Sequence, residues 1–129
     1  PSVLLIIVPR HPERFDSVYD LVKREGFTCL RRSTGKIFSE ETQIVVGDSM
    51  GELNNYYSIS HIAFVGGSLV DAGCQNILEP AALSLPIVVG PSQYNFASIC
   101  ENLKVKGGLI AVRDEKELAV EFLKLINSL

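Results

Sequence analysis

The residues of this chain that are best suited to chemistry lie in one short stretch, which combines glycines with an amide, a hydroxyl and a carboxylate. They are Gly66, Gly67, Ser68, Gly73, Asn76 and Glu79. Glycine has no Cβ, so a backbone that contains several glycines can approach a phosphate closely. The two carboxylate oxygens of Glu79 can accept hydrogen bonds from both hydroxyls of a ribose. The stretch is therefore a candidate site for a phosphate and a ribose.

Each feature of this stretch also has a structural interpretation, which the sequence leaves open. The glycines could serve only to make tight turns. Glu79 lies near a predicted helix start, where the helix dipole favours a carboxylate whether or not a ligand binds. The spacing of the glycines matches neither the GxGxxG dinucleotide fingerprint nor the GxxxxGK[ST] phosphate loop. The stretch thus indicates an anion site outside these two standard patterns.

Two other turns carry polar residues where predicted strands end. Arg10 follows the apolar run 3–8, and its guanidinium could pair with a phosphate or carboxylate through two hydrogen bonds, or could simply be solvated. The second turn, 47–52, contains Ser49 and Glu52. Their spacing predicts a capping box, with Ser49 at the N-terminus of a helix and Glu52 reaching back to it. Asp48 is an alternative cap.

The sequence offers no evident catalytic base, nucleophile or metal cluster. Ser68 has no clear His and Asp partners for a nucleophilic triad. Cys74 is a free thiol in a glycine loop and is interpreted as a small filler. His11 and His61 are far apart in the chain, so no metal site is predicted. The residues therefore favour binding over reaction.

Short apolar runs, which predict strands, alternate along the chain with stretches of helical periodicity. These strands and helices must position the residues named above. Strands are predicted over 3–8, 27–30, 43–46, 61–65, 86–89 and 109–112, with a possible edge strand at 36–38. Helices are predicted to begin near Pro12, Ser49, Glu79, Asn95 and Asp114, the last with a capping box to Glu117. The alternation predicts an α/β fold with a doubly wound, mostly parallel, six-stranded sheet. Turns 9–11, 47–52 and 66–79 should then meet where the strands end, which is where such sheets bind ligands.

Length, charge and cysteine content narrow the class of protein further. The 129 residues fit a single domain covering 1–129. The net charge of −3, from 12 basic and 15 acidic residues, disfavours a nucleic-acid partner. No apolar run is long enough to span a membrane. An odd count of three cysteines argues against a disulfide framework and fits a reducing, cytosolic compartment. A buried-type strand directly after Pro1 suggests that the chain was cut from a longer protein.

Five motifs, in order, resemble the C-terminal domain of the 3-deoxy-D-manno-octulosonic acid (Kdo) transferases of lipopolysaccharide synthesis. The resemblance covers nearly the whole chain. The motifs are PRHPERF at 9–15, GDSMGEL at 47–53 with Tyr56 and Tyr57, AFVGGS at 63–68, QNILEP at 75–80, and GP at 90–91 with Asn95 and Phe96.

The resemblance implies the donor-binding half of a two-domain GT-B glycosyltransferase with a Rossmann-like fold. Such an enzyme transfers Kdo from CMP-Kdo to a lipid A precursor at the cytoplasmic face of the inner membrane of a Gram-negative bacterium. The resemblance further implies that the acceptor binds to an N-terminal domain that this chain lacks. That domain would carry the catalytic base and the membrane association, so this chain alone would be inactive. The resemblance implies no cofactor and no metal.

The resemblance also assigns roles to individual residues. It implies that Pro9 and Arg10 contact the CMP moiety, Gly47, Met50 and Glu52 line the cytidine side, Gly66, Gly67 and Ser68 lie near the phosphate or sugar, Asn76 holds the phosphate, and Glu79 holds the ribose.

One departure from the family pattern falls inside the glycine stretch. The family usually has Gly-Gly-His-Asn before Leu-Glu-Pro, whereas this chain has Gly73, Cys74, Gln75 and Asn76. Gln75 can still donate and accept hydrogen bonds.

Two alternatives remain open at this point: half of a UDP-sugar epimerase or transferase, and a stand-alone nucleotide-binding regulatory module.

Overall fold

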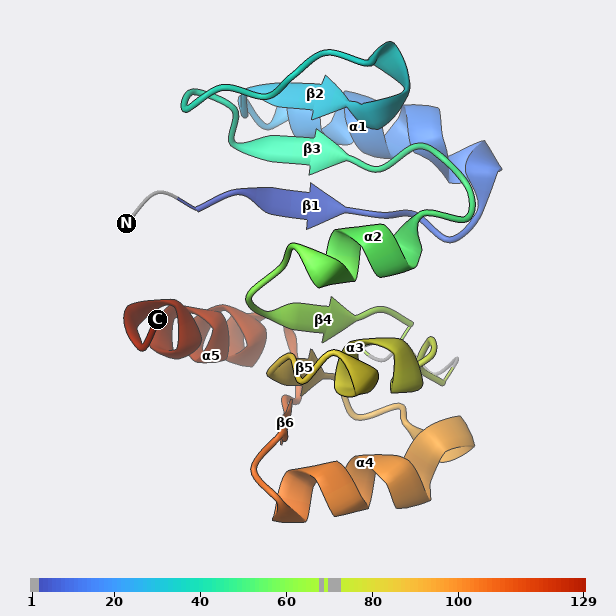
Figure 1. The fold of residues 1–129 in the computed structure, drawn as a ribbon, viewed down its shortest axis with the longest axis vertical. Helices are drawn as coiled ribbons and strands as arrows, with labels where there is room; N and C mark the ends of the chain where they lie inside the picture. The colour runs from blue at the N-terminus through green and yellow to red at the C-terminus, as the bar shows by residue number, and fades with distance from the viewer. Residues whose placement is uncertain (1–2, 68, 70–72) are drawn as a thin grey trace. The chain divides into compact units, whose positions relative to one another are not determined.

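The computed structural model describes residues 3–67, 69 and 73–129 (Figure 1). The chain divides into two compact units, Pro1–Tyr56 and Tyr57–Leu129. Each unit has its own parallel sheet and its own buried core. The two units are described in turn.

The first unit is a three-stranded parallel sheet covered by a helix. Its strands are β1 (Leu5–Ile7), β2 (Cys29–Arg31) and β3 (Ile44–Val46), in the order β1-β3-β2. Helix α1 (Phe15–Arg24) packs against β2 and β3, as Figure 1 shows. Short 3-10 helices at Pro12–Arg14 and Arg32–Thr34 follow β1 and β2.

The core of this unit follows from the apolar spacing of α1. The predicted stripe packs inward: Val22 is buried, and Val18 and Tyr19 lie against it. From the strands, Cys29, Ile44 and Val46 complete the buried cluster; Val46 is fully buried. In register, Ile7 and Arg31 both lie opposite Val46, so all three strands end at the same level.

The second unit repeats this arrangement with more helices. Its strands are β4 (Ala63–Val65), β5 (Ile87–Val89) and β6 (Leu109–Ala111), parallel and in that order. Helix α2 (Leu53–Ser58) leads from the first unit into the second. The other helices are α3 (Leu78–Ala82), α4 (Ala97–Val105) and α5 (Glu115–Asn127).

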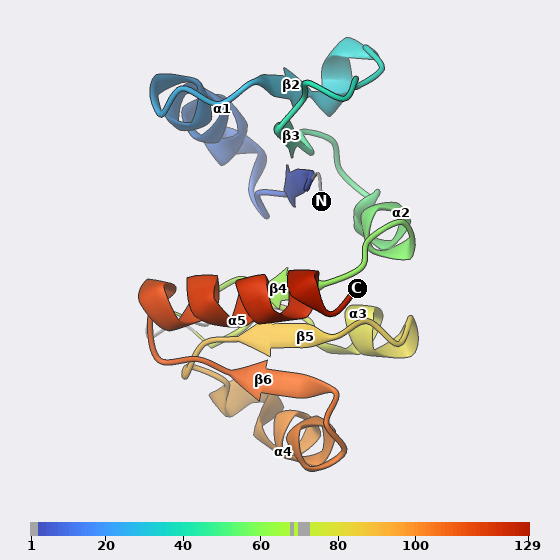
Figure 2. The ribbon, with the colours of Figure 1, turned by 90° about the vertical axis from the view of Figure 1, so that its left-hand side faces the viewer.

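Helices cover both faces of this second sheet. Figure 2 shows α5 on one face and α4 on the other, and they pack against β5 and β6 respectively. Side chains alternate along β4, so Val65 enters the core while Phe64 points to α5. The ring of Phe64 meets that of Phe122 edge-on at a centroid distance of 6.5 Å. The core residues are Val65, Cys74, Ile77, Ile87, Val89, Cys100 and Leu109.

The predicted α/β class with parallel strands is confirmed, and all six predicted strands are present. The prediction of one continuous six-stranded sheet differs from the structure, in which the described strands hydrogen-bond as two three-stranded sheets. The predicted edge strand at 36–38 does not form. Apolar patterning identifies a strand but does not specify its partner, which depends on how the strands and helices pack.

Two helix caps were predicted from local sequence patterns, and one of the two predictions is confirmed. Asp114 caps α5 as predicted, because its carboxylate accepts the N–H of Glu117 at 2.9 Å. The capping box at Ser49 is wrong, since α2 begins only at Leu53. Gly51 has a φ of +77°, a left-handed conformation that a helix cannot contain. No helix in the described part of the chain is long and apolar enough to cross a membrane.

Candidate functional site

In the first unit, the segments after β1, β2 and β3 share one edge of the sheet because the three strands are parallel. The N–H of Gly47 donates to the carbonyl of Ile7 at 2.8 Å. The start of the 47–52 turn therefore lies beside the end of β1, and Pro9 and Arg10 follow directly. Arg10 is exposed and makes no ion pair with any described residue. Sequence-predicted residues from these two turns thus lie close together.

Gly47 packs closely against Tyr56 at this edge. A Cβ built on Gly47 would lie 3.0 Å from ring atoms of Tyr56, a contact that real Cβ atoms rarely make. Tyr56 is buried, and its hydroxyl lies 3.4 Å from the hydroxyl of Ser49. The Tyr56 ring therefore sets the path of the backbone at the start of the 47–52 turn.

Glu52 is held by side chains at this edge. The Ser49 hydroxyl donates to Oε1 of Glu52, and Arg32 approaches Oε2 at 3.4 Å. The Ser49 hydroxyl therefore hydrogen-bonds to the Glu52 carboxylate. In the predicted capping box, that carboxylate would instead accept the backbone N–H of Ser49. Met50, in the same turn, has 63% of its surface exposed, so its side chain is accessible from solvent.

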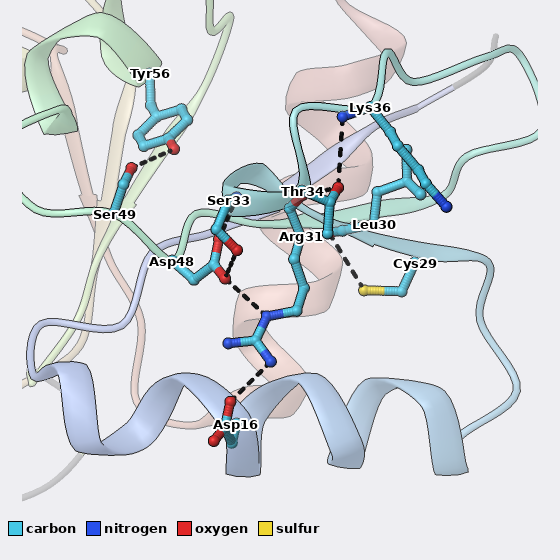
Figure 3. Close-up of polar contacts among 10 residues, drawn as sticks. All are labelled: Asp16, Cys29, Leu30, Arg31, Ser33, Thr34, Lys36, Asp48, Ser49 and Tyr56. Carbon is cyan, nitrogen blue, oxygen red and sulfur yellow. Dashed lines mark hydrogen bonds and ion pairs between the residues drawn. The ribbon is translucent and has the colours of Figure 1, made fainter.

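Asp48 is the centre of a polar network that the sequence did not reveal (Figure 3). Its side chain is 1% exposed. Oδ2 accepts the Nε–H of Arg31 at 2.7 Å and the Ser33 hydroxyl at 2.5 Å, and Oδ1 accepts the Ser33 N–H at 2.8 Å. Burial alone would raise the pKa of Asp48, but the hydrogen bonds from Ser33 and Arg31 together outweigh it and hold the pKa below its ordinary value.

Arg31 extends this network to α1. Its Nη1 pairs with Oδ1 of Asp16 at 2.7 Å, and its guanidinium carbon lies 5.3 Å from the centroid of the Tyr19 ring. Hydrogen bonds to Asp48 and Asp16 raise the pKa of Arg31. The network therefore ties the 47–52 turn to β2 and α1. The sequence does place polar residues, Arg31 and Asp48, at the ends of two apolar strands. To predict their contact from this signal, one would also have to know that β2 and β3 are neighbours in the sheet.

In the second unit, the glycine stretch is held by hydrogen bonds within the protein. The N–H of Gly73 donates to the Ser92 hydroxyl at 2.8 Å. The N–H of Cys74 donates to Oδ1 of Asn95 at 3.1 Å, and that of Gln75 to the carbonyl of Gly66 at 2.9 Å. Three consecutive N–H groups therefore have intramolecular acceptors. The N–H of Gly73 is therefore engaged by a protein group, the Ser92 hydroxyl.

The glycines of this stretch allow two backbone segments to approach closely. Gly67 has a φ of +80°, and a Cβ on it would lie 2.7 Å from the carbonyl oxygen of Gly73. Gly66 and Gly67 follow β4 directly and thus lie at the carboxyl end of the second sheet. The predicted site residue Ser68 lies outside the described residues. Gly66 and Gly67 accordingly lie beside the segment that leads to α3.

Asn76 and Glu79 lie at the start of α3. Asn76 is exposed, and its Oδ1 accepts the N–H of Leu78 at 2.9 Å. The side-chain oxygen Oε2 of Glu79 is buried and has no hydrogen-bond partner in the described part of the chain. Burial, and next the charge of Glu79, raise the pKa of Tyr57. Buried polar atoms nearly always have a partner, so this oxygen is a candidate ligand contact.

The predicted residues thus fall into two sets. Pro9, Arg10, Gly47, Met50 and Glu52 belong to the first unit, and Gly66, Gly67, Asn76 and Glu79 belong to the second. Among the described residues, no group of three or more His, Cys, Asp or Glu side chains could hold a metal ion.

Comparisons with known proteins identify relatives. No protein-family model matches the chain. A 3-deoxy-D-manno-octulosonic acid transferase of Haemophilus influenzae is 50% identical over 131 residues, 99% of this chain and 30% of that protein. The corresponding protein of Bordetella pertussis is 32% identical, covering 90% of this chain and 27% of that protein. A bifunctional glycosyltransferase/methyltransferase of Fusobacterium nucleatum is 37% identical, covering 99% and 20%.

A solved structure agrees with these relatives. It is the crystal structure of the C-terminal CMP-Kdo binding domain of WaaA from Acinetobacter baumannii, with a TM-score of 0.90 and 39% identity. The match covers 95% of this chain and 64% of that chain. The chain spans between 20% and 30% of the length of the three sequence relatives. The chain is thus similar in sequence to 3-deoxy-D-manno-octulosonic acid transferases, and in sequence and fold to the C-terminal CMP-Kdo binding domain of WaaA.

Proposed function

We propose that residues 1–129 form the donor-binding domain of a Kdo transferase and that the ligand of this domain is CMP-Kdo. The observation that carries the proposal is Oε2 of Glu79, at the start of α3, which is buried and has no hydrogen-bond partner among residues 3–67, 69 and 73–129. A carboxylate oxygen in this condition needs a hydrogen-bond donor, and a ribose diol would supply two hydroxyls. The 39% identity to a solved CMP-Kdo binding domain supports the same ligand.

The remaining predicted residues have roles consistent with such a ligand. Arg10 is an exposed cation at the edge of the first sheet, suited to the phosphate of CMP. Gly47, Met50 and Glu52 lie in the neighbouring turn, where cytidine contacts are proposed. In the second unit, Gly66 and Gly67 with Ser68 would lie near the phosphate or sugar, and Asn76 would hold the phosphate. Its Oδ1 is engaged by Leu78, so the amide NH₂ would donate.

The reaction proposed for the longer protein is an inverting transfer. A hydroxyl of a lipid A precursor attacks the anomeric carbon of Kdo, a base removes the proton of that hydroxyl, and CMP leaves. Negative charge develops on the leaving phosphate, so Arg10 would stabilise the transition state electrostatically. We place the base, the acceptor site and any association with the cytoplasmic face of the inner membrane outside this chain.

Calorimetric titration of the chain with CMP and with UDP tests the proposal. CMP should bind more tightly than UDP, because the site would be built for a cytosine base and one phosphate. Stronger binding of UDP would contradict the Kdo assignment and favour the UDP-sugar alternative. Binding of neither nucleotide would contradict a nucleotide-sugar site altogether.

A separate prediction concerns Arg10. Arg10→Ala should weaken CMP binding by about 1.5–3 kcal/mol, or about tenfold to a hundredfold, because a hydrogen bond to a charged group is lost. The measurement is the dissociation constant for CMP from the same titration. Arg24→Ala is the matched control: it removes an exposed arginine from the last turn of α1, at the opposite end of that helix from the turn that contains Arg10. Equal affinity in the two variants would make Arg10 a solvated turn residue.

A further inference from the structure

The segment that follows β5 has no assigned role, although Gly90, Pro91, Asn95 and Phe96 contribute one of the five sequence motifs. Within it, the side chain of Asn95 pairs with both backbone polar groups of one residue. Oδ1 accepts the N–H of Cys74 at 3.1 Å, and Nδ2 donates to the carbonyl of Cys74 at 2.8 Å. The amide thus satisfies the peptide groups of Cys74 as a neighbouring strand would.

Packing around Asn95 leaves little freedom for this pairing to shift. A Cβ on Gly73 would lie 2.8 Å from Oδ1 of Asn95, so only glycine allows the two to approach. Cys74 is 5% exposed, and Ser92 binds the preceding N–H, that of Gly73. The segment after β5 therefore fixes two consecutive residues of the glycine stretch.

The fixed segment leads directly to the proposed ligand contacts. Cys74 is followed by Gln75, whose N–H is bound to Gly66, and then by Asn76. The side chain of Ile77 is fully buried, so the chain is also anchored after Asn76. Asn76 and Glu79 therefore lie on a short piece of backbone whose starting point is set by Asn95.

We propose that Asn95 is a positioning residue of the donor site: by holding Cys74, it sets the path of residues 73–79 so that Asn76 and Glu79 reach the ligand. Ser92 has a smaller part: it accepts one hydrogen bond, from the N–H of Gly73, whereas Asn95 engages both backbone groups of Cys74. The ligand part of this inference rests on the proposed function. The part that concerns the backbone does not.

Two measurements on the chain test the inference. In Asn95→Ala, the amide proton of Cys74 should exchange with solvent at least about tenfold faster, because its acceptor is lost. The dissociation constant for CMP should rise by about tenfold, and Ser92→Ala should raise it by a smaller factor. Gln93→Ala is the matched control in the same segment, since its Nε2 donates to the carbonyl of Gly90, which lies in that segment and not in the glycine stretch. It should leave both quantities unchanged.

A stability control separates positioning from general loosening of the fold. Ile87→Val removes a methylene from the core of the second unit and should lower the melting temperature without changing CMP affinity. If Asn95→Ala and Ile87→Val weaken CMP binding equally, Asn95 is only structural, and the proposal is overturned. Unchanged exchange at Cys74 in Asn95→Ala would also overturn it. If the unmodified chain binds no CMP, the proposed function and the ligand role of Asn95 both fail, whereas exchange still decides whether Asn95 holds the backbone.

Discussion

Glu79→Ala should weaken CMP binding by about ten- to a hundredfold while leaving the free energy of unfolding within about 1 kcal/mol of its original value. The affinity falls because a carboxylate that accepts ribose hydroxyls is lost. Stability is preserved because Oε2 of Glu79 has no protein partner in the described part of the chain, so the substitution breaks no hydrogen bond at that atom. Titration with CMP and urea unfolding measure the two quantities.

A control distinguishes the ribose role from the effect of a carboxylate at a helix start. Glu115 lies in the first turn of α5, as Glu79 does in α3, and it is exposed. Glu115→Ala should cost a few tenths of a kcal/mol to about 1 kcal/mol of stability, through the helix dipole, and should not affect CMP binding. If Glu79→Ala behaves in the same way as Glu115→Ala, Glu79 is only a helix-start carboxylate.

Asp48→Asn should lower the free energy of unfolding by about 2–3 kcal/mol at neutral pH, because the guanidinium of Arg31 and the donors of Ser33 lose a buried carboxylate and face an unsuitable partner. An asparagine has one oxygen, whereas both oxygens of Asp48 accept hydrogen bonds. If the NH₂ group replaces Oδ1, it faces the N–H of Ser33; if it replaces Oδ2, it faces the Nε–H of Arg31. Two donors oppose each other in either orientation. Urea unfolding at pH 7 measures the loss.

Asp16→Asn is the matched control, because Asp16 pairs with the same arginine at the same 2.7 Å. The side chain of Asp16 is 83% exposed, and solvent screens such pairs, so the expected loss is at most about 1 kcal/mol. Equal losses in the two variants would show that burial of Asp48 adds nothing to the network.

The contribution of Asp48 should also depend on pH. Its folded pKa lies below the ordinary value of 3.8, so the unfolded chain takes up the proton first as the pH falls. The stabilisation is therefore fully present above the unfolded pKa and is lost as the pH falls through the folded pKa. The difference in stability between the original chain and Asp48→Asn should shrink between neutral and strongly acidic pH. A constant difference would contradict the depressed pKa of Asp48.

Several parts of the fold follow from signals within a few residues of one another. The six strands appear where apolar runs predicted them. The stripe of α1 packs inward and Asp114 caps α5, because helical periodicity and caps involve neighbours in the chain. The five motifs that resemble Kdo transferases agree with the sequence relatives and with the solved domain. The α/β fold class, the order of the strands along the chain and the similarity to a family could therefore be predicted from the sequence.

The candidate site was only partly predictable. Glu79 was singled out as a carboxylate near a helix start, but the sequence did not show that its Oε2 is buried and lacks a hydrogen-bond partner among the described residues. The Ser49 cap was misplaced because Gly51 adopts a left-handed conformation and α2 begins only at Leu53. A capping pattern does not specify the conformation of the residues between its two members.

The sequence by itself determined the six strands, the cap of α5 and the family to which the chain is similar. Only the tertiary structure decided the partners. Arg31 meets Asp48 because β2 and β3 are neighbours in the sheet, and Asn95 meets Cys74 because the segment after β5 lies against the glycine stretch. Local conformation depends on nearby residues, whereas contacts between distant segments depend on how the whole core packs.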